Sequence, residues 1–522
     1  MNLRFCLLPG SVAVALFLST GPVLAQSDCT DCHGGVYTKW AAGAHATTQT
    51  NVASELSQSD AGLTPGEVVQ QEDCLGCHGP QAVVANGPMS ESDAMGFFFT
   101  TSNGEFSAAT TVTNTAMWPQ VDCVTCHNVP GDHPSTLPTL AVFNSQTKQY
   151  MAVANSSALC GQCHGNLHFA DTDHLIYNAW TNSAHAHTQG DVADELSHDD
   201  IGLTPAGVVQ DENCIACHAP TAVLANGGMT EGQALGYFFT TSNGAFSDAT
   251  VVTNASDWPS VGCITCHDPH DPGKVSYFNS STKQYQVMAD AAQLCGQCHG
   301  NLRFPDTDHL SYNILQGTGG VGVADQKTMP GTTCTDCHMH SSDVDGSLSL
   351  DFHGHTWGIT VTEPDGTTTT SCTTCHSTMD TAGANTTIAS FKADFQALDA
   401  TVEANVTRAA AALQSSTNAT WLAALQEAQH NMTYAESDES GGFHNHTYLM
   451  ALLNDANAKA LSVPLLNADV QGVNIIISWT GGGTLQSAPA VSGPWSDVSG
   501  ATNPMTLGPS SRGQEQFYRL RP

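Results

Sequence analysis

The arrangement of the cysteines constrains this chain more than any other feature of its sequence. Of its 19 cysteines, all except Cys6 fall in Cys-x-x-Cys-His motifs, of which there are nine. Two residues between the cysteines let both thiols add to the vinyl groups of one porphyrin, while the following imidazole reaches the iron. The motifs therefore predict nine haem c groups, attached through Cys29, Cys32, Cys74, Cys77, Cys123, Cys126, Cys160, Cys163, Cys214, Cys217, Cys263, Cys266, Cys295, Cys298, Cys334, Cys337, Cys372 and Cys375. The expected proximal iron ligands are His33, His78, His127, His164, His218, His267, His299, His338 and His376.

Other uses of paired cysteines explain this pattern less well. Zinc sites and thioredoxin-like redox motifs contain Cys-x-x-Cys pairs, but neither requires a histidine after every second cysteine. A secreted disulfide framework accounts for an even number of cysteines and leaves the histidines unexplained. A partial calcium-loop pattern at Asp343, Asp345 and Gly346 lacks the terminal glutamate, so a polar turn is the better interpretation.

Residues 1–25 have the pattern of a secretory signal peptide. Arg4 supplies the positive start, an apolar stretch follows, and Val23 to Ala25 form a cleavage-site pattern that leaves Gln26 as the first mature residue. No later stretch is apolar for long enough to cross a bilayer. We therefore expect an exported protein without a membrane span, located in the periplasm, at the cell surface or outside the cell.

The charge of the chain is strongly acidic, with 13 Lys and Arg against 48 Asp and Glu and a formal net charge of −35. Such a surface repels nucleic acid, whose binding depends on neutralising phosphates with basic side chains. It favours docking to a basic redox partner protein, or adsorption to an external electron acceptor through bound cations. Solubility alone explains the charge equally well.

The short spacing between motifs leaves too little chain for separate hydrophobic cores, so the porphyrins must form the core. We expect a mostly α and irregular fold, a multihaem cytochrome c wrapped around a haem chain. Periodic apolar residues after the last motif predict C-terminal helices, and alternating residues after them predict a small all-β domain. The expected domains are a signal peptide (1–25), a nine-haem region (26–387), a helical segment (388–463) and a β domain (464–522).

A long internal duplication relates residues 37–174 to residues 177–309. Tyr37 and Trp40 recur as Tyr177 and Trp180, and the motifs of the first copy recur in the same order. The first copy is longer in the loop after its third motif. Residues that match between the copies are therefore the best candidates for shared roles.

Histidines outside the motifs are candidates for the second axial ligand of each iron. His45 matches His185, and His174 matches His309, whereas His133 and His270 follow a motif too closely to reach their own iron and are expected to serve a neighbouring haem. His168, His187 and His198 lack a histidine in the other copy and are interpreted as surface residues or as residues that contact a ligand without binding the iron. Each candidate has the alternative of a solvent-facing or core histidine. The predicted distal ligands are His45, His133, His174, His185, His270, His309, His353, His355 and His444.

The haem of the first motif has no obvious local partner in the sequence. We therefore expect its distal ligand to come from the C-terminal helices or, as a hypothesis, from another subunit. The second case would make assembly into an oligomer or filament part of haem ligation.

Several sequence frames resemble those of multihaem c-type cytochromes. They include Tyr-x-x-Trp-x-x-x-Ala-His at residues 37–45 and Leu-Cys-Gly-Gln-Cys-His at residues 159–164. The segment from Gly442 to Asn445 and the helix after it resemble the C-terminal helices of the nitrite reductase and hydroxylamine oxidoreductase branch. The resemblance implies respiratory electron carriers, filament-forming cytochromes, or reductases of nitrogen and sulfur oxyanions. Pentahaem nitrite reductases commonly use a lysine in the active-haem motif, whereas all nine motifs here end in histidine.

The sequence thus favours an exported nonahaem c-type cytochrome that carries electrons along closely spaced bis-histidine haems. One form of this hypothesis is an extracellular cytochrome that assembles into filaments. The alternative is a multihaem oxidoreductase that acts on a small nitrogen or sulfur compound at one open haem. A six-coordinate iron suits electron transfer because no ligand has to bind or leave. An open iron is required for the enzyme, and no catalytic residue is assigned from the sequence.

Overall fold

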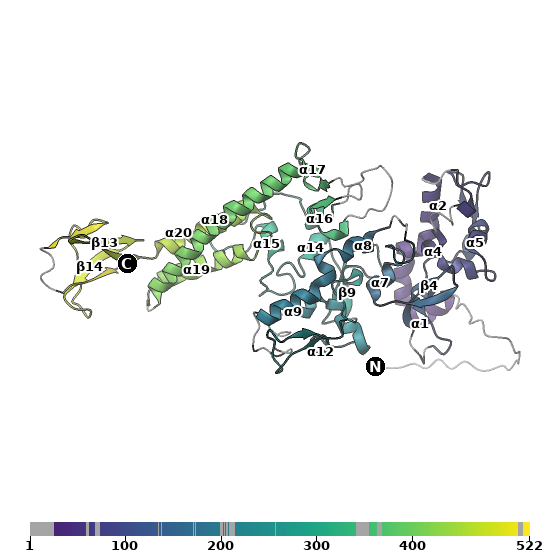
Figure 1. Ribbon diagram of the computed structural model, residues 1–522, viewed down its shortest axis with the longest axis horizontal. Coiled ribbons are helices and arrows are strands. Elements are labelled where there is room, and N and C mark those ends of the chain that lie inside the picture. The colour runs from purple at the N-terminus through teal and green to yellow at the C-terminus, as the bar shows by residue number, and fades with distance from the viewer. Residues whose placement is uncertain are drawn as a thin grey trace. The chain divides into compact units, whose positions relative to one another are not determined.

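A computed structural model describes residues 26–522, apart from 59–61, 68–73, 134, 137, 171, 173, 199–201, 203, 205–206, 208–213, 256, 341–353, 363–367, 415, 510–514 and 522. The described residues are about 44% helical and form small sheets, as expected for a mostly α and irregular multihaem cytochrome fold; Figure 1 shows the arrangement of these elements. It divides into two compact units, residues 1–163 with 269–273, and residues 164–268 with 274–522. The predicted signal peptide, His353 and the polar turn predicted at Asp343–Gly346 lie outside the described residues, and the predicted domain boundaries stay predictions.

The first unit consists of short helices and two small antiparallel sheets. Its helices are α1 (Gln26–Ala41), α2 (Thr48–Gln58), α4 (Cys74–His78), α5 (Glu91–Phe98), α6 (Cys123–Cys126) and α7 (Ser156–Cys160). Its strands are β1 (Phe99–Thr100), β2 (Thr111–Val112), β3 (His127–Asn128), β4 (Thr139–Asn144) and β5 (Gln149–Ala152). Strand β1 pairs with β2, and β3, β4 and β5 form a meander.

The second unit repeats this pattern before it continues into the C-terminal part. Its short helices are α8 (Ile176–Thr181), α9 (Thr188–His198), α11 (Cys214–His218), α12 (Glu231–Phe238), α13 (Cys263–Cys266), α14 (Ala291–Cys295), α15 (Ser311–Gln316), α16 (Cys334–His338) and α17 (Cys372–Cys375). The pairs β6 (Phe239–Thr240) with β7 (Val251–Val252), β8 (Ser276–Asn279) with β9 (Gln284–Val287), and β10 (Thr360–Thr362) with β11 (Thr368–Thr370) are antiparallel hairpins.

Each copy of the duplication has an aromatic core. Trp118 packs edge-on against Phe98 with ring centroids 4.5 Å apart, and Trp258 packs in the same way against Phe238 at 4.5 Å. Both tryptophans are 5% exposed. Such pairs add stability beyond the apolar area that they bury. The two copies thus have matching cores, against which their haem motifs are placed.

Three long helices follow the last motif: α18 (Thr381–Leu413), α19 (Ala419–Glu436) and α20 (His446–Ser462). The side chains of Asp380 and Asn418 cap the first turns of α18 and α19 by accepting backbone N–H groups. Apolar residues that recur at helical spacing, such as Val402 and Val406, form one buried core with α20 and with Ile314 of α15. None of the described helices is long and apolar enough to cross a membrane.

The chain ends in a small β module. Strands β12 (Leu465–Gln471), β13 (Asn474–Thr480) and β16 (Met505–Leu507) form one sheet, and β15 (Ser496–Asp497), β14 (Thr484–Ala488) and β17 (Phe517–Arg521) form the other. Among its described residues, Ile477, Leu485, Gln486 and Ala488 are buried. The guanidinium of Arg519 lies 4.4 Å from the ring centroid of Trp495.

Candidate haem sites

In seven motifs both cysteines lie within one helix, whereas in the fourth and seventh the helix ends at the first cysteine. In α6, residues Cys123 and Cys126 are one turn apart, and the Asp122 side chain caps the helix by accepting the backbone N–H of Thr125 at 3.1 Å. The helix ends at His127, whose backbone is extended. This local geometry presents two sulfurs and one imidazole to the same region, as covalent haem attachment requires.

Six motif histidines face a second histidine across a gap of the same size. The ring centroids are 5.9–6.3 Å apart in the pairs His33–His133, His127–His270, His299–His185, His218–His309, His267–His355 and His338–His444. A metal–nitrogen bond of about 2 Å on each side, together with the ring radius, separates two axial imidazoles by about 6.3 Å. The observed gaps therefore have the size that an iron with two axial imidazoles needs.

Hydrogen bonds at Nδ1 hold several of these rings in place. The Nδ1 atoms contact the Trp357 carbonyl from His338 (2.9 Å), the Thr136 carbonyl from His133 (3.2 Å), Asp438 Oδ1 from His444 (2.6 Å) and Glu439 Oε1 from His309 (2.6 Å). An acceptor at one ring nitrogen fixes the tautomer and frees the other nitrogen for a metal. The His133, His338 and His444 rings are thus arranged for ligation through Nε2, whereas Nε2 of His309 lies 3.6 Å from Asp308 Oδ1.

Burial keeps most of these imidazoles in the neutral form that binds a metal. Desolvation lowers the pKa of His185, His218 and His355 to about 4 in each case, with nearby histidines adding to the effect. His444 differs, because burial lowers its pKa but the hydrogen bond and charge of Asp438 raise it above the ordinary value overall.

Cysteines of different motifs contact one another within each unit. In the first unit, thiol hydrogen bonds join Cys29 to Cys123 and Cys77 to Cys163. In the second unit they join Cys217 to Cys298 and Cys295 to Cys334. Haems attached at contacting cysteines would lie close to each other. The Cys77–Cys163 and Cys217–Cys298 contacts occupy equivalent positions in the two copies.

Trp357 lies where three of the histidine pairs meet. Its ring contacts His185 and His355 edge-on, with centroids 4.3 Å and 5.4 Å away, and its carbonyl faces Nδ1 of His338. The backbone φ of Trp357 is +53°, which is uncommon for a bulky side chain and costs of order 1–3 kcal/mol. No pattern in the sequence indicates this role.

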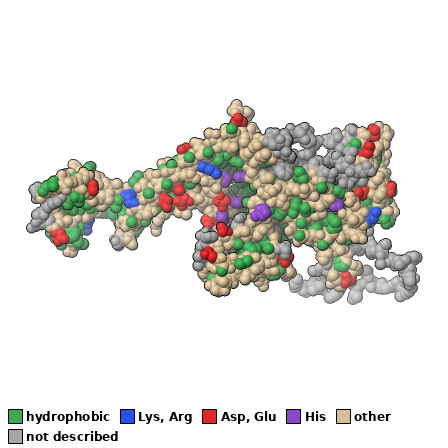
Figure 2. Space-filling model, in the orientation of Figure 1, with side chains coloured by type: hydrophobic (Ala, Val, Ile, Leu, Met, Phe, Trp, Pro, Cys, Tyr) green, Lys and Arg blue, Asp and Glu red, His purple; other side chains and the backbone are tan. Residues whose placement is uncertain are grey.

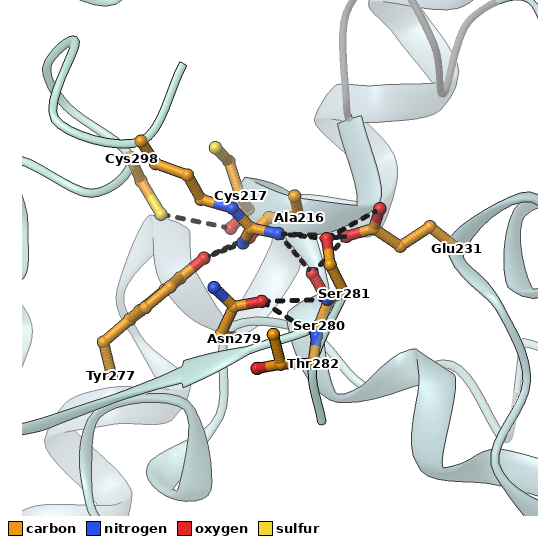
Figure 3. A network of polar contacts seen from close by, with 10 residues as sticks. Ala216, Cys217, Glu231, Tyr277, Asn279, Ser280, Ser281, Thr282 and Cys298 are labelled. Atoms are coloured by element: carbon orange, nitrogen blue, oxygen red, sulfur yellow. Dashed lines mark hydrogen bonds and ion pairs between the residues drawn. The ribbon is translucent and has the colours of Figure 1, made fainter. Parts of the chain in front are cut away.

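A largely buried ion pair lies beside the fifth and seventh motifs (Figure 3). Arg303 Nη2 lies 3.1 Å from Glu231 Oε1, and the two side chains are 8% and 15% exposed. Arg303 also donates to the Tyr277 hydroxyl and contacts the carbonyl of Ala216, the residue before Cys217. A fixed positive charge therefore lies next to two haem-attachment cysteines.

The structure corrects one expectation about the first motif. Its histidine, His33, faces His133, which follows the third motif in the same unit, in the place expected for a ligand from the C-terminal helices or another subunit. His133 follows the third motif and His270 the sixth, and each faces the histidine of a different motif, as their spacing predicted.

The remaining histidines have other surroundings. His45 has its pKa lowered by burial and by the nearby His270. His430 and His446 contact the carbonyls of Gly319 and Gly442, and His187 on the surface contacts that of Thr181. His168 packs on Phe169, and the side chain of His198 lies outside the described residues. The ring pairs above include none of His45, His78, His164, His174 and His376, whose ligand roles stay predictions.

The protein itself offers no complete metal site, since no group of three or more His, Cys, Asp or Glu side chains that could hold a metal ion occurs among the described residues. Two axial imidazoles complete an iron whose other four ligands come from a porphyrin. The residues therefore fit haem c, which when bound supplies reversible one-electron iron chemistry.

Comparisons with known proteins agree with this chemistry. The cytochrome c552 family matches residues 324–472, and the cytochrome c554 and c-prime family matches residues 28–96 and 159–235. The second family thus matches the corresponding part of both copies. The chain is a multihaem c-type cytochrome, which binds haem c iron and transfers electrons.

Solved structures with similarity to the chain are also cytochromes. They include the outer cell wall cytochrome OcwA (16% identity, TM-score 0.44, 83% of this chain and 99% of that chain). An undecahaem cytochrome from the S-layer of Carboxydothermus ferrireducens has 17% identity and a TM-score of 0.34, over 70% of this chain and 53% of that chain. Cytochrome c nitrite reductase from Desulfovibrio desulfuricans has 16% identity and a TM-score of 0.35, over 53% and 70%. No curated protein matches.

Proposed function

We propose that this protein is an exported nonahaem cytochrome that conducts electrons between a respiratory donor and an external or periplasmic acceptor. The observation that carries the proposal is the contact between cysteines of different motifs within each unit. Closely spaced porphyrin edges favour electron transfer from one haem to the next.

The contacts support an order of motifs within each unit. In the first unit, the first motif contacts the third, and Cys163 of the fourth lies near both Cys126 of the third and Cys77 of the second. In the second unit, the seventh motif contacts the fifth and the eighth and lies near Cys266 of the sixth. Cys337 of the eighth motif in turn lies near Cys372 of the ninth.

The histidine pairs support bis-histidine ligation of the irons. Six pairs have the spacing for two axial imidazoles, and His45 and His174 hold positions equivalent to His185 and His309 of two such pairs. Ligation by two imidazoles keeps the potential below that of a haem with a methionine ligand. Filament formation rests only on the density of haem motifs and the acidic charge, because His133 faces His33 and a ligand from another subunit is not needed there.

The acidic surface supports docking to a basic partner. Figure 2 shows many Asp and Glu side chains and few Lys and Arg on the visible face, in keeping with 48 acidic against 13 basic residues. Opposite charge on a donor or acceptor would accelerate association at low ionic strength. Export rests on the signal-peptide pattern of residues 1–25.

Two measurements on the purified oxidised protein test the proposal. The mass and the haem content per chain should correspond to nine haems. Electron paramagnetic resonance should show only low-spin ferric haem. One high-spin haem in nine would overturn the pure conduit and favour the alternative, an oxidoreductase acting on a small nitrogen or sulfur compound at that haem.

A further inference from the structure

Two consecutive carboxylates hold two distal histidine candidates. Asp438 and Glu439 lie in the turn between α19 and α20. Asp438 Oδ1 is 2.6 Å from Nδ1 of His444, and Glu439 Oε1 is 2.6 Å from Nδ1 of His309. His444 faces His338 of the eighth motif, and His309 faces His218 of the fifth. One turn therefore contacts the distal histidine candidates of two different haems.

The two carboxylates differ in burial. The Asp438 side chain is fully buried, and Ser440 Oγ donates to its other oxygen while accepting the backbone N–H of Phe443 at 2.7 Å. The Glu439 side chain is 54% exposed. Water screens the Glu439 charge, whereas Asp438 acts through a medium of lower dielectric.

The acceptor at Nδ1 affects how strongly an imidazole donates electrons to a metal. A carboxylate acceptor makes the ring more basic than a neutral carbonyl does, and it also fixes the orientation of the ring. His133 and His338 supply the comparison within the same chain, because their Nδ1 atoms face the carbonyls of Thr136 and Trp357. A more basic ligand stabilises the ferric state and so lowers the reduction potential.

We propose that Asp438 and Glu439 are positioning residues that fix the His444 and His309 rings and lower the potentials of the two haems that these rings ligate. The inference rests on the bis-histidine ligation of the proposed function and goes beyond it, because it assigns two of the lowest potentials to the fifth and eighth haems. Asp438, being buried, has the larger effect.

The test uses full-length haem-loaded protein with Asp438→Asn and Glu439→Gln, which retain a side-chain acceptor but remove its charge. Redox titration followed by absorbance should show one haem in Asp438→Asn whose reduction is about tenfold more favourable, about 59 mV for one electron. Glu439→Gln should shift a different haem by about threefold. In each variant one low-spin resonance signal should move while the spin state stays low.

Glu427→Gln is the matched control, because this α19 carboxylate is 42% exposed and pairs with Lys459 at 2.9 Å without contacting a histidine. Potentials and resonance signals that shift no more than in the control would overturn the inference. If Asp438→Asn does not yield haem-loaded protein, Glu439→Gln decides alone. A high-spin signal at the fifth or eighth haem of the unchanged protein would instead show that the ligand assignment of the proposed function is wrong.

Discussion

The same position holds His168 in the first copy of the duplication and Arg303 in the second. Glu91 of the first copy accepts a hydrogen bond from Ser145 at 2.6 Å, and its equivalent, Glu231, accepts one from Ser280. In the second copy, Glu231 also forms an ion pair with Arg303, the residue equivalent to His168. The copies therefore keep one scaffold for the motifs and differ in the charge beside them. A fixed positive charge near a haem favours its reduced state, so equivalent haems of the two copies are expected to differ in potential.

The shared aromatic core gives the largest expected effect and the same effect in both copies. Trp118→Ala and Trp258→Ala each remove a buried ring that packs on two phenylalanines. Each change should lower the free energy of unfolding of its unit by about 3–5 kcal/mol. Guanidinium unfolding followed by circular dichroism measures this, with the Trp→Phe variants as controls that keep most of the packing. A large effect in one copy alone would show that the two cores are not equivalent.

Substitution at the ion pair of the second copy should cost more stability than substitution at the equivalent position of the first copy. Arg303→Met keeps the volume but leaves the Glu231 carboxylate and the Tyr277 hydroxyl without their cation. Breaking a buried pair in this way should cost about 3 kcal/mol, whereas His168→Met in the first copy should cost less than about 1 kcal/mol.

A redox titration of the same Arg303→Met protein should show a haem of the fifth or seventh motif that is harder to reduce. Glu231→Gln combined with Arg303→Met should recover part of the stability, because the buried carboxylate is no longer charged. Equal losses of stability in Arg303→Met and His168→Met would contradict the expected difference between the two copies.

Much of this organisation was predictable from the sequence, because its signals are local. The motifs have fixed spacing, the duplication aligns them, and the closeness of His133 to the third motif correctly indicated that it faces another one. The Asp438 and Arg303 contacts could not be predicted in this way. They depend on a turn that packs against a motif far away in the chain, and an acidic residue in a turn has no distinguishing pattern in an acidic protein.

The caps of two equivalent motif helices should respond differently to pH. Burial raises the pKa of Asp122, the cap of α6, to about 6, although hydrogen bonds from Thr125 lower it, whereas the cap of α13 is Gly262. The folded state then holds a proton that the unfolded state has released between about pH 4 and pH 6, so stability falls as pH rises through this window. Because the side chain keeps some solvent contact, we expect about 2 kcal/mol.

Thermal unfolding from pH 4 to pH 7 tests this with reciprocal variants. Asp122→Asn keeps a capping side chain and should flatten the pH dependence of the first unit. Gly262→Asp should introduce such a dependence in the second unit. A pH profile unchanged by Asp122→Asn would mean that another group is responsible.

The smallest expected difference lies in the caps of the helices that carry the aromatic core. In α12, Thr230 and Gln233 form a reciprocal capping box, whereas in α5 Ser90 accepts the backbone N–H of Asp93 at 3.1 Å as a single bond. Thr230→Ala should therefore cost about 1 kcal/mol and Ser90→Ala about 0.5 kcal/mol. Gln233→Ala should bring the stability of the second-copy cap close to that of the first, because it removes the bonds from Thr230 to Gln233 Oε1 and keeps the bond from the Gln233 backbone N–H to Thr230. If Thr230→Ala and Ser90→Ala prove equal in unfolding, the difference between the copies is confined to the charged groups beside the motifs.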